Sequence, residues 1–283
     1  MLRCFAAKHL YTPMTETLRS QRTLPQSDII ASMFNKLRNY FFLNQYSISV
    51  FVLLNVACLI CVGLVAARVA YSDSNQHTGL IWNLFLAWIP FMLAYFAHAI
   101  SWRRIWVYFV IPVIALLWMI FFPNAPYMLT DLQDLARTAT DAPLWYDVLI
   151  VVWCSWTGML LGVISLYLMQ NIVQRTFSRA AGWVFVFVIS GMSSFGVYVG
   201  RFVRINSWDI LQNPAETAMN ILGIVIDPSM RLAAFTILYT FFFLFVYLLL
   251  YSFSHLHREH KSKSKARKLY KHMARSQSPN DQE

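Results

Sequence analysis

Charged residues are scarce in this chain. Of its 283 residues only 13% are Asp, Glu, Lys or Arg, whereas 58% are hydrophobic and the mean hydropathy is +0.49. A soluble domain carries about 25% charged residues, so the composition excludes a soluble fold and predicts an integral membrane protein. The formal net charge of +10 would suggest nucleic-acid binding in a soluble protein. Here most basic residues lie in the tails and in alternate connections between apolar segments, as shown below. The positive charge is therefore explained by membrane topology, and we expect no nucleic-acid partner.

Cysteine is also rare, with Cys4, Cys58, Cys61 and Cys154 the four in the chain. None lies in a segment expected outside the cytoplasm, which excludes a disulfide framework. Cys58 and Cys61 form a Cys-x-x-Cys motif inside an apolar segment. A redox or metal site needs solvent access and polar surroundings, so we interpret this pair as small helix-packing residues.

Six apolar segments are each long enough to cross a bilayer, which takes about 20 residues of α-helix. They lie near residues 47–70, 79–100, 104–122, 144–172, 182–203 and 229–253. The sequence therefore predicts an all-α, polytopic bundle of six transmembrane helices. Its expected parts are an N-terminal tail (1–46), a membrane domain (47–253) and a basic C-terminal tail (254–283).

Lysine and arginine are distributed unevenly between the connections. Six precede the first span, two follow the second, two follow the fourth and eight follow the last, so 18 of the 23 lie in these four regions. Cytoplasmic segments of membrane proteins are enriched in these residues. We therefore expect both termini in the cytoplasm and the remaining loops, which are more acidic, on the extracytoplasmic side.

The basic tail after residue 253 has two interpretations. Basic residues beside a membrane attract anionic lipid headgroups, but they also mark a cytoplasmic tail with no further role. A metal site at His255, His257 and His260 is disfavoured by the surrounding positive charge. The expected partners are thus the lipid bilayer and, at this tail, anionic lipid headgroups.

The segment Phe121–Leu135 changes from apolar to polar and acidic. Pro123 and Pro126 lack amide hydrogens and restrict the residues before them, so we expect the chain to break here. Asn124 would then cap a short new helix over 126–138. That helix would carry two carboxylates three residues apart on one face.

A second polar segment, residues 204–228, contains the sequence Asn213-Pro214-Ala215-Glu216. A capping residue, a first-turn proline and an acidic third position predict a helix start. The resulting helix over about 214–226 is too short to span a bilayer, and we expect it to lie at the extracytoplasmic interface. Asp227 and the proline after it are expected to open the last span.

Alternate spans should bring these polar residues to one end of the bundle. Arg201 and Arg204 lie where the fifth span ends, so they need anionic partners or a route to lipid headgroups. The set forms either an enclosed ligand pocket or an ordinary interface of solvated carboxylates, lipid-contacting arginines and belt aromatics. The candidate residues are Asn124, Tyr127, Thr130, Asp131, Asp134, Tyr146, Asp147, Arg201, Arg204, Asn206, Trp208 and Asp209.

Several of these motifs together resemble a known family. They are Pro123-Asn124-Ala125-Pro126-Tyr127, Thr130-Asp131-Leu132, Pro143-Leu144-Trp145-Tyr146-Asp147, Arg201-Phe202 and Arg204-x-Asn206-Ser207-Trp208-Asp209. The chain is similar over most of residues 80–253 to the uncharacterised bacterial membrane-protein family called domain of unknown function 1361. The resemblance implies a multi-pass protein of the bacterial cytoplasmic (inner) membrane, and it implies no particular activity.

Three functions fit these residues. The first, which we expect, is solute or lipid binding in a transport-associated role. The others are a membrane-embedded enzyme acting on an envelope lipid or polymer through an aspartate acid or base, and a purely structural clamp of the outer loops. Asn55 and Asn83, within the spans, are expected to form interhelical hydrogen bonds.

The sequence identifies no catalytic residue and no cofactor. Only His77 and oxygen ligands are expected at the outer face, so a metal site there would use Asp131, Asp134 and Asp147 and would suit Mg²⁺, Ca²⁺ or Mn²⁺ better than Zn²⁺. No signature spacing supports such a site, and none is predicted.

Overall fold

The computed structural model describes residues 26–72, 75, 77–101, 104–137, 143–205 and 212–276. The chain divides into two compact units, residues 1–55 and 56–283. In the first unit Asn55 Nδ2 donates a hydrogen bond to the Phe51 carbonyl oxygen of its own helix, at 2.8 Å. The expected interhelical bond of Asn55 is therefore replaced by a local one.

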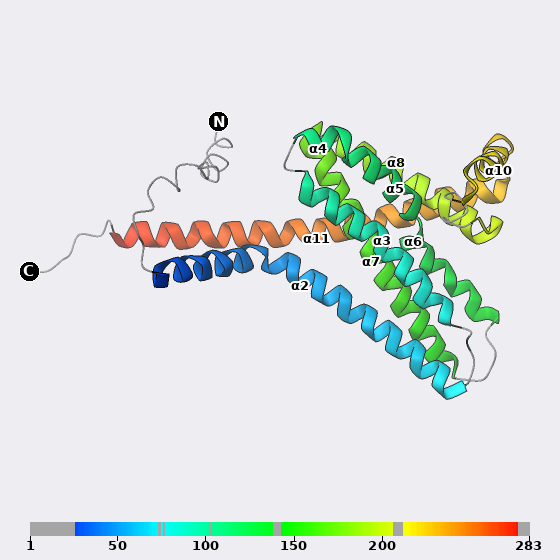
Figure 1. The fold of residues 1–283 in the computed structure, drawn as a ribbon, viewed down its shortest axis with the longest axis horizontal. Helices are drawn as coiled ribbons and strands as arrows, with labels where there is room; N and C mark the ends of the chain where they lie inside the picture. The colour runs from blue at the N-terminus through cyan, green and yellow to red at the C-terminus, as the bar shows by residue number, and fades with distance from the viewer. Residues whose placement is uncertain are drawn as a thin grey trace, which may run out of the picture. The chain divides into compact units, whose positions relative to one another are not determined.

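Every regular element in the described ranges is helical (Figure 1). The long helices are α2 (Gln26–Ser72), α3 (Thr78–Ile100), α5 (Ile111–Phe121), α7 (Leu144–Thr176), α8 (Arg179–Tyr198) and α11 (Met230–Ser276). The shorter ones are α4 (Arg104–Phe109), α6 (Asn124–Tyr127), the 3-10 helix η2 (Met128–Arg137), the π-helix η3 (Val199–Val203) and α10 (Pro214–Ile226). Six segments are long and apolar enough to cross a membrane: Ser49–Ser72, Thr78–Ile100, Ile111–Leu135, Leu144–Thr176, Arg179–Val203 and Met230–Phe253. The predicted six-span, all-α fold is confirmed.

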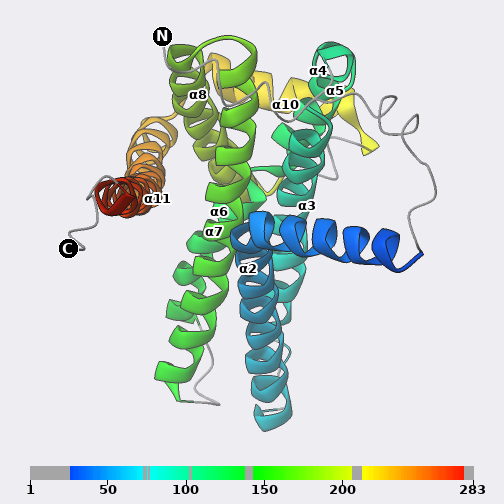
Figure 2. The same ribbon diagram turned by 90° about the vertical axis from the view of Figure 1, so that its left-hand side faces the viewer.

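Helix α7 is at the centre of the second unit. It packs against α3, α6, η2 and α8, and α11 packs against α8; Figure 2 shows α7 running beside α3 and α8. Trp118 of α5 is buried in this core, and its Nε1 donates a hydrogen bond to Ser165 Oγ of α7 at 2.6 Å. Ser165 Oγ in turn donates to the Pro90 carbonyl oxygen of α3 at 3.0 Å. These bonds satisfy buried polar atoms that would otherwise destabilise the bundle.

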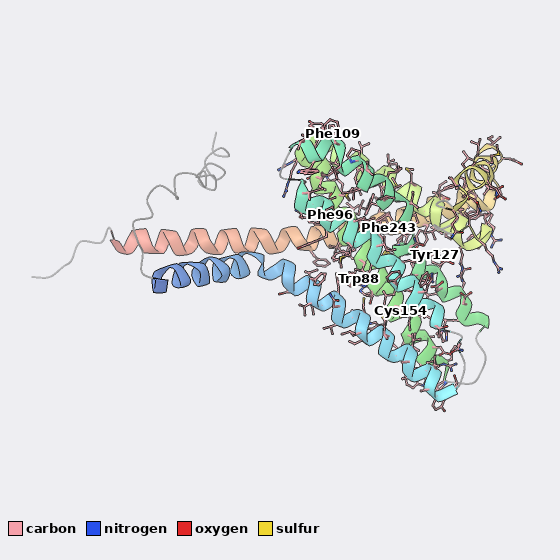
Figure 3. All side chains as sticks on the ribbon, viewed as in Figure 1. Trp88, Phe96, Phe109, Tyr127, Cys154 and Phe243 are labelled. Carbon is pink, nitrogen blue, oxygen red and sulfur yellow. The ribbon has the colours of Figure 1, made fainter. Side chains whose placement is uncertain are left out.

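Large apolar side chains also cover the outside of the bundle. Phe96 of α3 and Phe109 of α4 are exposed, whereas Phe243 of α11 is buried (Figure 3). A soluble monomer rarely exposes so many large apolar residues together. This surface is suited to lipid, in agreement with the six candidate spans.

The third span differs from the prediction in position. It begins at Ile111 instead of 104, because α4 and α5 are interrupted at Val110, and it continues to Leu135. The expected break at the two prolines is confirmed: α5 ends at Phe121, residues 122 and 123 form a turn, and α6 begins at Asn124. Pro123 keeps helical φ and ψ of −58° and −24°, and the Tyr127 amide donates to its carbonyl oxygen at 3.0 Å. A proline near a helix start loses no amide bond that the helix needs.

The helix type changes after Tyr127. The short new helix expected over 126–138 is present as α6 followed by the 3-10 helix η2 over residues 128–137. In a 3-10 helix, side chains three residues apart eclipse each other, so Asp131 and Asp134 still share one face. Asn124 does not cap this helix: its Nδ2 donates to the Phe121 carbonyl oxygen at 3.0 Å and so binds an otherwise free end of α5.

Glycines of α7 and α8 allow the segment around α6 to approach closely. A Cβ atom at Gly158 would lie 3.0 Å from the Ala125 carbonyl oxygen, and one at Gly162 would lie 3.1 Å from Ala125 Cβ. A Cβ atom at Gly196 of α8 would lie 2.7 Å from Pro123 Cγ. Small residues at these positions therefore fix the place of the proline-containing segment between the two helices.

Helix α8 ends in an unusual conformation. Its last turn continues as the π-helix η3 over Val199–Val203, which contains Arg201. Arg204 follows with φ 64° and ψ 32°, the one non-glycine residue with positive φ in the described chain. Both features carry a conformational cost and occur preferentially at functional sites.

The predicted boundaries of α10 are confirmed, but the next helix, α11, does not begin at Asp227 as expected. Asp227 ends α10 as its C-cap instead of opening the last span. Ser229 has the capping role at α11, because its Oγ accepts a hydrogen bond from the Leu232 amide at 3.2 Å. Helix α11 then continues to Ser276, so the backbone of most of the basic tail extends the last span as a helix.

Candidate functional site

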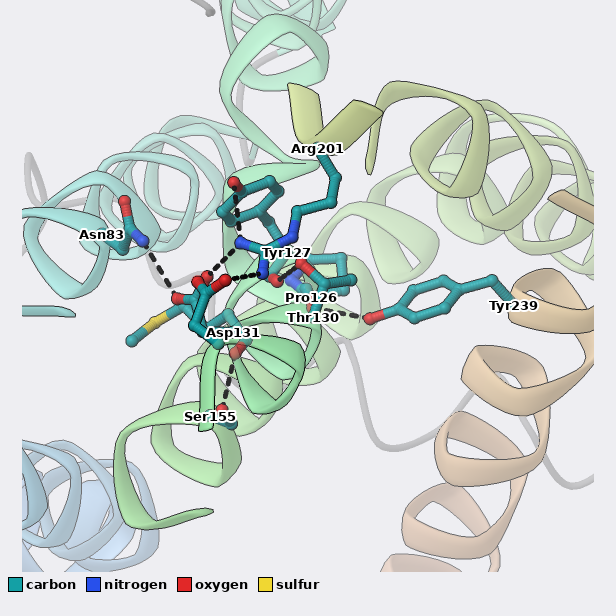
Figure 4. A network of polar contacts seen from close by, with 10 residues as sticks. Asn83, Pro126, Tyr127, Thr130, Asp131, Ser155, Arg201 and Tyr239 are labelled. Atoms are coloured by element: carbon teal, nitrogen blue, oxygen red, sulfur yellow. Dashed lines mark hydrogen bonds and ion pairs between the residues drawn. The ribbon is translucent and has the colours of Figure 1, made fainter. Parts of the chain in front are cut away.

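Five polar side chains meet where η2 lies beside the end of α8 (Figure 4). Arg201 Nη1 lies 3.0 Å from Asp131 Oδ1, and Arg201 Nη2 lies 2.7 Å from Asp134 Oδ1. Arg201 Nη1 also donates to the Tyr127 hydroxyl oxygen at 3.5 Å, and Asn83 Nδ2 of α3 donates to Asp131 Oδ2 at 3.1 Å. We call these residues the Arg201 cluster. It joins α3, α6, η2 and η3.

The two carboxylates of the Arg201 cluster differ in their access to solvent. The side chain of Asp131 is 9% exposed and that of Arg201 12%, whereas Asp134 is 56% exposed. A buried charge needs its partner, because an isolated one is strongly destabilising. An exposed ion pair contributes only about 0–1 kcal/mol. Asp131 is thus the fixed partner of Arg201, and Asp134 can be displaced at small cost.

Hydrogen bonds from two other helices and one within the segment hold the backbone of this region. Ser155 Oγ of α7 donates to the Met128 carbonyl oxygen at 2.6 Å, and Tyr239 OH of α11 donates to the Pro126 carbonyl oxygen at 2.6 Å. Thr130 Oγ1 donates to the Tyr127 carbonyl oxygen at 2.7 Å within the segment itself. Such bonds satisfy carbonyl groups left free where α6 changes to η2. They give the aspartates a rigid support.

Asp147 belongs to a second, separate cluster. Arg68 Nε of α2 donates to Asp147 Oδ1 at 2.6 Å, and Arg68 Nη2 donates to Oδ2 at 3.3 Å. Both side chains are 1% exposed. Arg68 Nη1 also bonds to Ser72 Oγ, and His77 Nε2 lies 3.3 Å from Asp147 Oδ1. We call Arg68, Ser72, His77 and Asp147 the Arg68 cluster.

The Arg68 cluster attaches α2 to α7. The neighbouring Tyr146 OH donates to the Leu64 carbonyl oxygen of α2 at 3.0 Å, and Trp153 Nε1 donates to the Ala57 carbonyl oxygen at 3.2 Å. The bidentate pair between Arg68 and Asp147 is stronger than the two neutral hydrogen bonds, because both of its partners are charged. Long polar side chains therefore connect these two helices along their length.

The structure thus divides the residues expected to form one set. Asp147 pairs with Arg68 and not with Arg201 or Arg204, and Tyr146 lies with it against α2. Asn124 closes the end of α5, and Thr130 supports the backbone. Arg204 is exposed and has no ion pair among the described residues. The predictions for Asn206, Trp208 and Asp209 fall outside the described residues.

Sequence reasoning missed the role of Arg68 and His77. Arg68 is the basic residue inside the first apolar segment, and an ionisable residue within a span is by itself a signal for a buried partner or a functional site. His77 gave no comparable signal, because it precedes the second span in a loop. Asn83 was assigned an interhelical bond, and the structure gives it one, to Asp131.

Within the described ranges, no group of three His, Cys, Asp or Glu side chains is placed to hold a metal ion. The chemistry of the Arg201 cluster is instead that of one guanidinium, two carboxylates, a phenol and an amide. A guanidinium presents a planar set of donors to phosphate or carboxylate oxygens. The arrangement can bind an anionic group at the side where Asp134 is exposed.

The fold and these clusters define a multi-pass helical membrane protein in which an Arg-Asp-Tyr cluster joins α3, α6, η2 and η3. A family model described as "Protein of unknown function (DUF1361)" matches residues 82–273, and the chain belongs to this family. The matched range includes the whole Arg201 cluster, but not Arg68 or His77. No curated protein and no solved structure matches the chain.

Proposed function

We propose that the protein binds a polar solute or a lipid headgroup at the Arg201 cluster, in a transport-associated role. The observation that carries this proposal is the unequal pairing of Arg201, which holds one buried and one exposed carboxylate. A purely structural ion pair gains little stability from a second, exposed partner, since such a pair adds at most about 1 kcal/mol. In a binding site, by contrast, an exposed carboxylate can be displaced from the guanidinium by an incoming anionic ligand.

The ligand group that fits is a phosphate or a carboxylate. It would take the place of the Asp134 carboxylate at Arg201 Nη2, 2.7 Å away in the present arrangement. Asp131 and Asn83 would keep the guanidinium in position, and the Tyr127 hydroxyl would supply a further hydrogen-bonding group near Nη1. Charge-assisted bonds of this kind are the strongest polar contacts available to a ligand.

The backbone that delivers Arg201 supports a binding role. A π-helix at Val199–Val203 and a left-handed Arg204 are costly conformations that persist where function requires them. They place the guanidinium over the Tyr127 ring, 5.9 Å from its centroid. A cation in this position is also attracted by the ring.

We further propose that this end of the bundle faces away from the cytoplasm. The distribution of lysine and arginine supports cytoplasmic termini, and an even number of spans then puts the end of α8 and the start of α7 on the opposite side. The bacterial inner membrane is the location that the family resemblance suggests. A ligand would enter from the extracytoplasmic space or the outer leaflet.

The proposal is tested by ligand-induced stabilisation of the purified, full-length protein. Inorganic phosphate, glycerol phosphate and acetate would be titrated while thermal unfolding is followed by tryptophan fluorescence. A ligand that binds the folded state raises the unfolding temperature as its concentration exceeds Kd. We expect stabilisation by at least one phosphate or carboxylate compound, and none in Arg201→Gln.

Asp134→Asn is the matched variant in this experiment. It removes the exposed competitor for Arg201 without removing a buried charge, so we expect tighter anion binding than in the unmodified protein. The binding proposal fails under two conditions together. No anion stabilises the unmodified protein or Asp134→Asn, and the two proteins retain the same amount of bound phospholipid. The structural clamp would then be the better account of the cluster.

A further inference from the structure

Two more arginines lie at the same end of the bundle as the Arg201 cluster. Arg204 immediately follows the candidate span Arg179–Val203, and Arg231 is the second residue of the candidate span Met230–Phe253. The helices of these spans, α8 and α11, pack against each other. Both arginines are exposed. They therefore lie at the membrane boundary on neighbouring helices.

Aromatic packing brings these two helix ends together. The Arg231 guanidinium lies over the Phe202 ring, with Cζ 4.5 Å from the ring centroid. Phe202 in turn packs against Tyr198 and Phe235, at centroid distances of 4.8 and 5.3 Å. Because Phe202 is two residues before Arg204, the Arg231 side chain is held beside the end of α8. Among the described residues its charge is oriented by a ring, and no carboxylate forms an ion pair with it.

Arg231 also occupies an electrostatically unfavourable position. It lies in the first turn of α11, whose amide groups give the helix N-terminus a partial positive charge. A cation there is repelled unless an anion is bound nearby. Arg204 brings a second positive charge to the same boundary. The two side chains together favour an anionic ligand.

Helix α10 indicates that this ligand is a lipid. It lies in the chain between the two arginines and leaves four large apolar side chains exposed: Met219, Leu222, Val225 and Ile226. Because its last residue is only four positions before the start of the α11 span, α10 must lie at the level of the membrane interface. An apolar helix there inserts its side chains among acyl chains.

We propose that Arg204 and Arg231 form a specific site for the headgroup of an anionic phospholipid, with the acyl chains against α8, α10 and α11. Basic residues between transmembrane helices at the headgroup level recognise such lipids. Arg231 offers its charge above Phe202, and Arg204 supplies a second set of donors at the end of η3. This site is separate from the Arg201 cluster, whose guanidinium is already paired with two aspartates.

The test uses the full-length protein in nanodiscs of phosphatidylcholine with a small fraction of phosphatidylglycerol. The bound phosphatidylglycerol is counted by native mass spectrometry after release. Each arginine near a membrane surface contributes roughly a fivefold gain in affinity for anionic lipid. We therefore expect Arg204→Gln and Arg231→Gln to weaken phosphatidylglycerol retention about fivefold each, and the double variant about 25-fold.

The matched control is Arg175→Gln with Arg179→Gln, which removes the same charge from the turn between α7 and α8 at the other end of the bundle. It should change retention by less than the double variant at Arg204 and Arg231. The basic tail is the same in all these proteins, so its own attraction for lipid cancels. Equal losses in both double variants would show general charge attraction and overturn the specific site.

Two further arms identify the ligand. Inorganic phosphate at millimolar concentration should not displace bound phosphatidylglycerol if the acyl chains contribute to binding; displacement would indicate a soluble anion instead of a lipid. Arg201→Gln removes at most the headgroup bound at the Arg201 cluster, so the phosphatidylglycerol held by Arg204 and Arg231 should remain. Loss of lipid in Arg201→Gln together with retention in the double variant would refute the assignment to Arg204 and Arg231.

Discussion

Breaking the buried ion pair of the Arg68 cluster should destabilise the protein severely. Arg68 and Asp147 are each 1% exposed, and they share two charge-assisted hydrogen bonds. Substituting Arg68→Gln leaves the Asp147 carboxylate buried without its guanidinium. Removal of one partner from a buried pair costs about 3–5 kcal/mol, mostly because the remaining charge has lost its compensation. His77, 3.3 Å from Asp147, offsets part of this loss only when it is protonated.

The double variant Arg68→Met with Asp147→Leu separates the effect of an unpaired charge from that of lost packing. Replacing both partners of a buried pair by apolar residues of similar volume is often neutral or stabilising. We therefore expect it to recover most of the stability lost in Arg68→Gln. Asp134→Asn is the exposed counterpart, since Asp134 is 56% exposed, and it should cost at most about 1 kcal/mol.

The assay is unfolding by SDS in mixed micelles, followed by tryptophan fluorescence. The chain has 10 tryptophans, and Trp153 reports directly on the contact between α2 and α7. If Arg68→Gln unfolds at the same SDS fraction as Asp134→Asn, the Arg68 pair is not the buried attachment that we describe. If Arg68→Gln does not accumulate, Asp147→Asn and the double variant still decide the question, because only the double variant should be near-normal.

Three shorter predictions concern packing, membrane contact and orientation. Gly196→Ala should destabilise the protein by about 1–3 kcal/mol, because the new Cβ would contact the rigid Pro123 ring. Gly191→Ala in the same helix should not, because a Cβ there meets nothing within 4 Å. Equal SDS unfolding midpoints for the two variants would contradict the close packing. A spin label at Met219→Cys of α10 should be accessible to oxygen dissolved in the bilayer, and one at Asn220→Cys to a water-soluble relaxation agent. The same preference at both positions would contradict the position of α10 at the membrane interface. Reporter fusions after Pro143 should be extracytoplasmic and fusions after Ser178 cytoplasmic, and the reverse would refute the orientation.

Local properties of the chain made much of the fold predictable. Hydropathy and length identify the six spans because each span must satisfy its own backbone hydrogen bonds within the bilayer, whatever its neighbours are. The same applies to α10, whose start is marked by Asn213-Pro214 and whose boundaries match the prediction. The prolines correctly marked the end of α5 at Phe121 and the start of α6, because proline is compatible with a helix start but not with a helix interior.

Partner choice could be predicted only in part. Arg201 was identified because it lies at the end of an apolar span, where it needs an anion, and the structure pairs it with Asp131 and Asp134. The sequence could not assign Asp147 to Arg68, because the two residues are 79 positions apart and α2 had no predicted neighbour. Which helices lie side by side depends on packing among all six.

The sequence by itself determined the class of protein, the number of spans and the end of the bundle at which polar residues gather, because these follow from apolar length and from alternation across the membrane. Only the tertiary structure decided that the polar residues form two clusters instead of one. It also decided that a 3-10 helix and a π-helix present Asp131 and Arg201 to each other. The physical reason is that helix type and ion pairing depend on close contacts between segments distant in the chain, as where Gly196 admits Pro123.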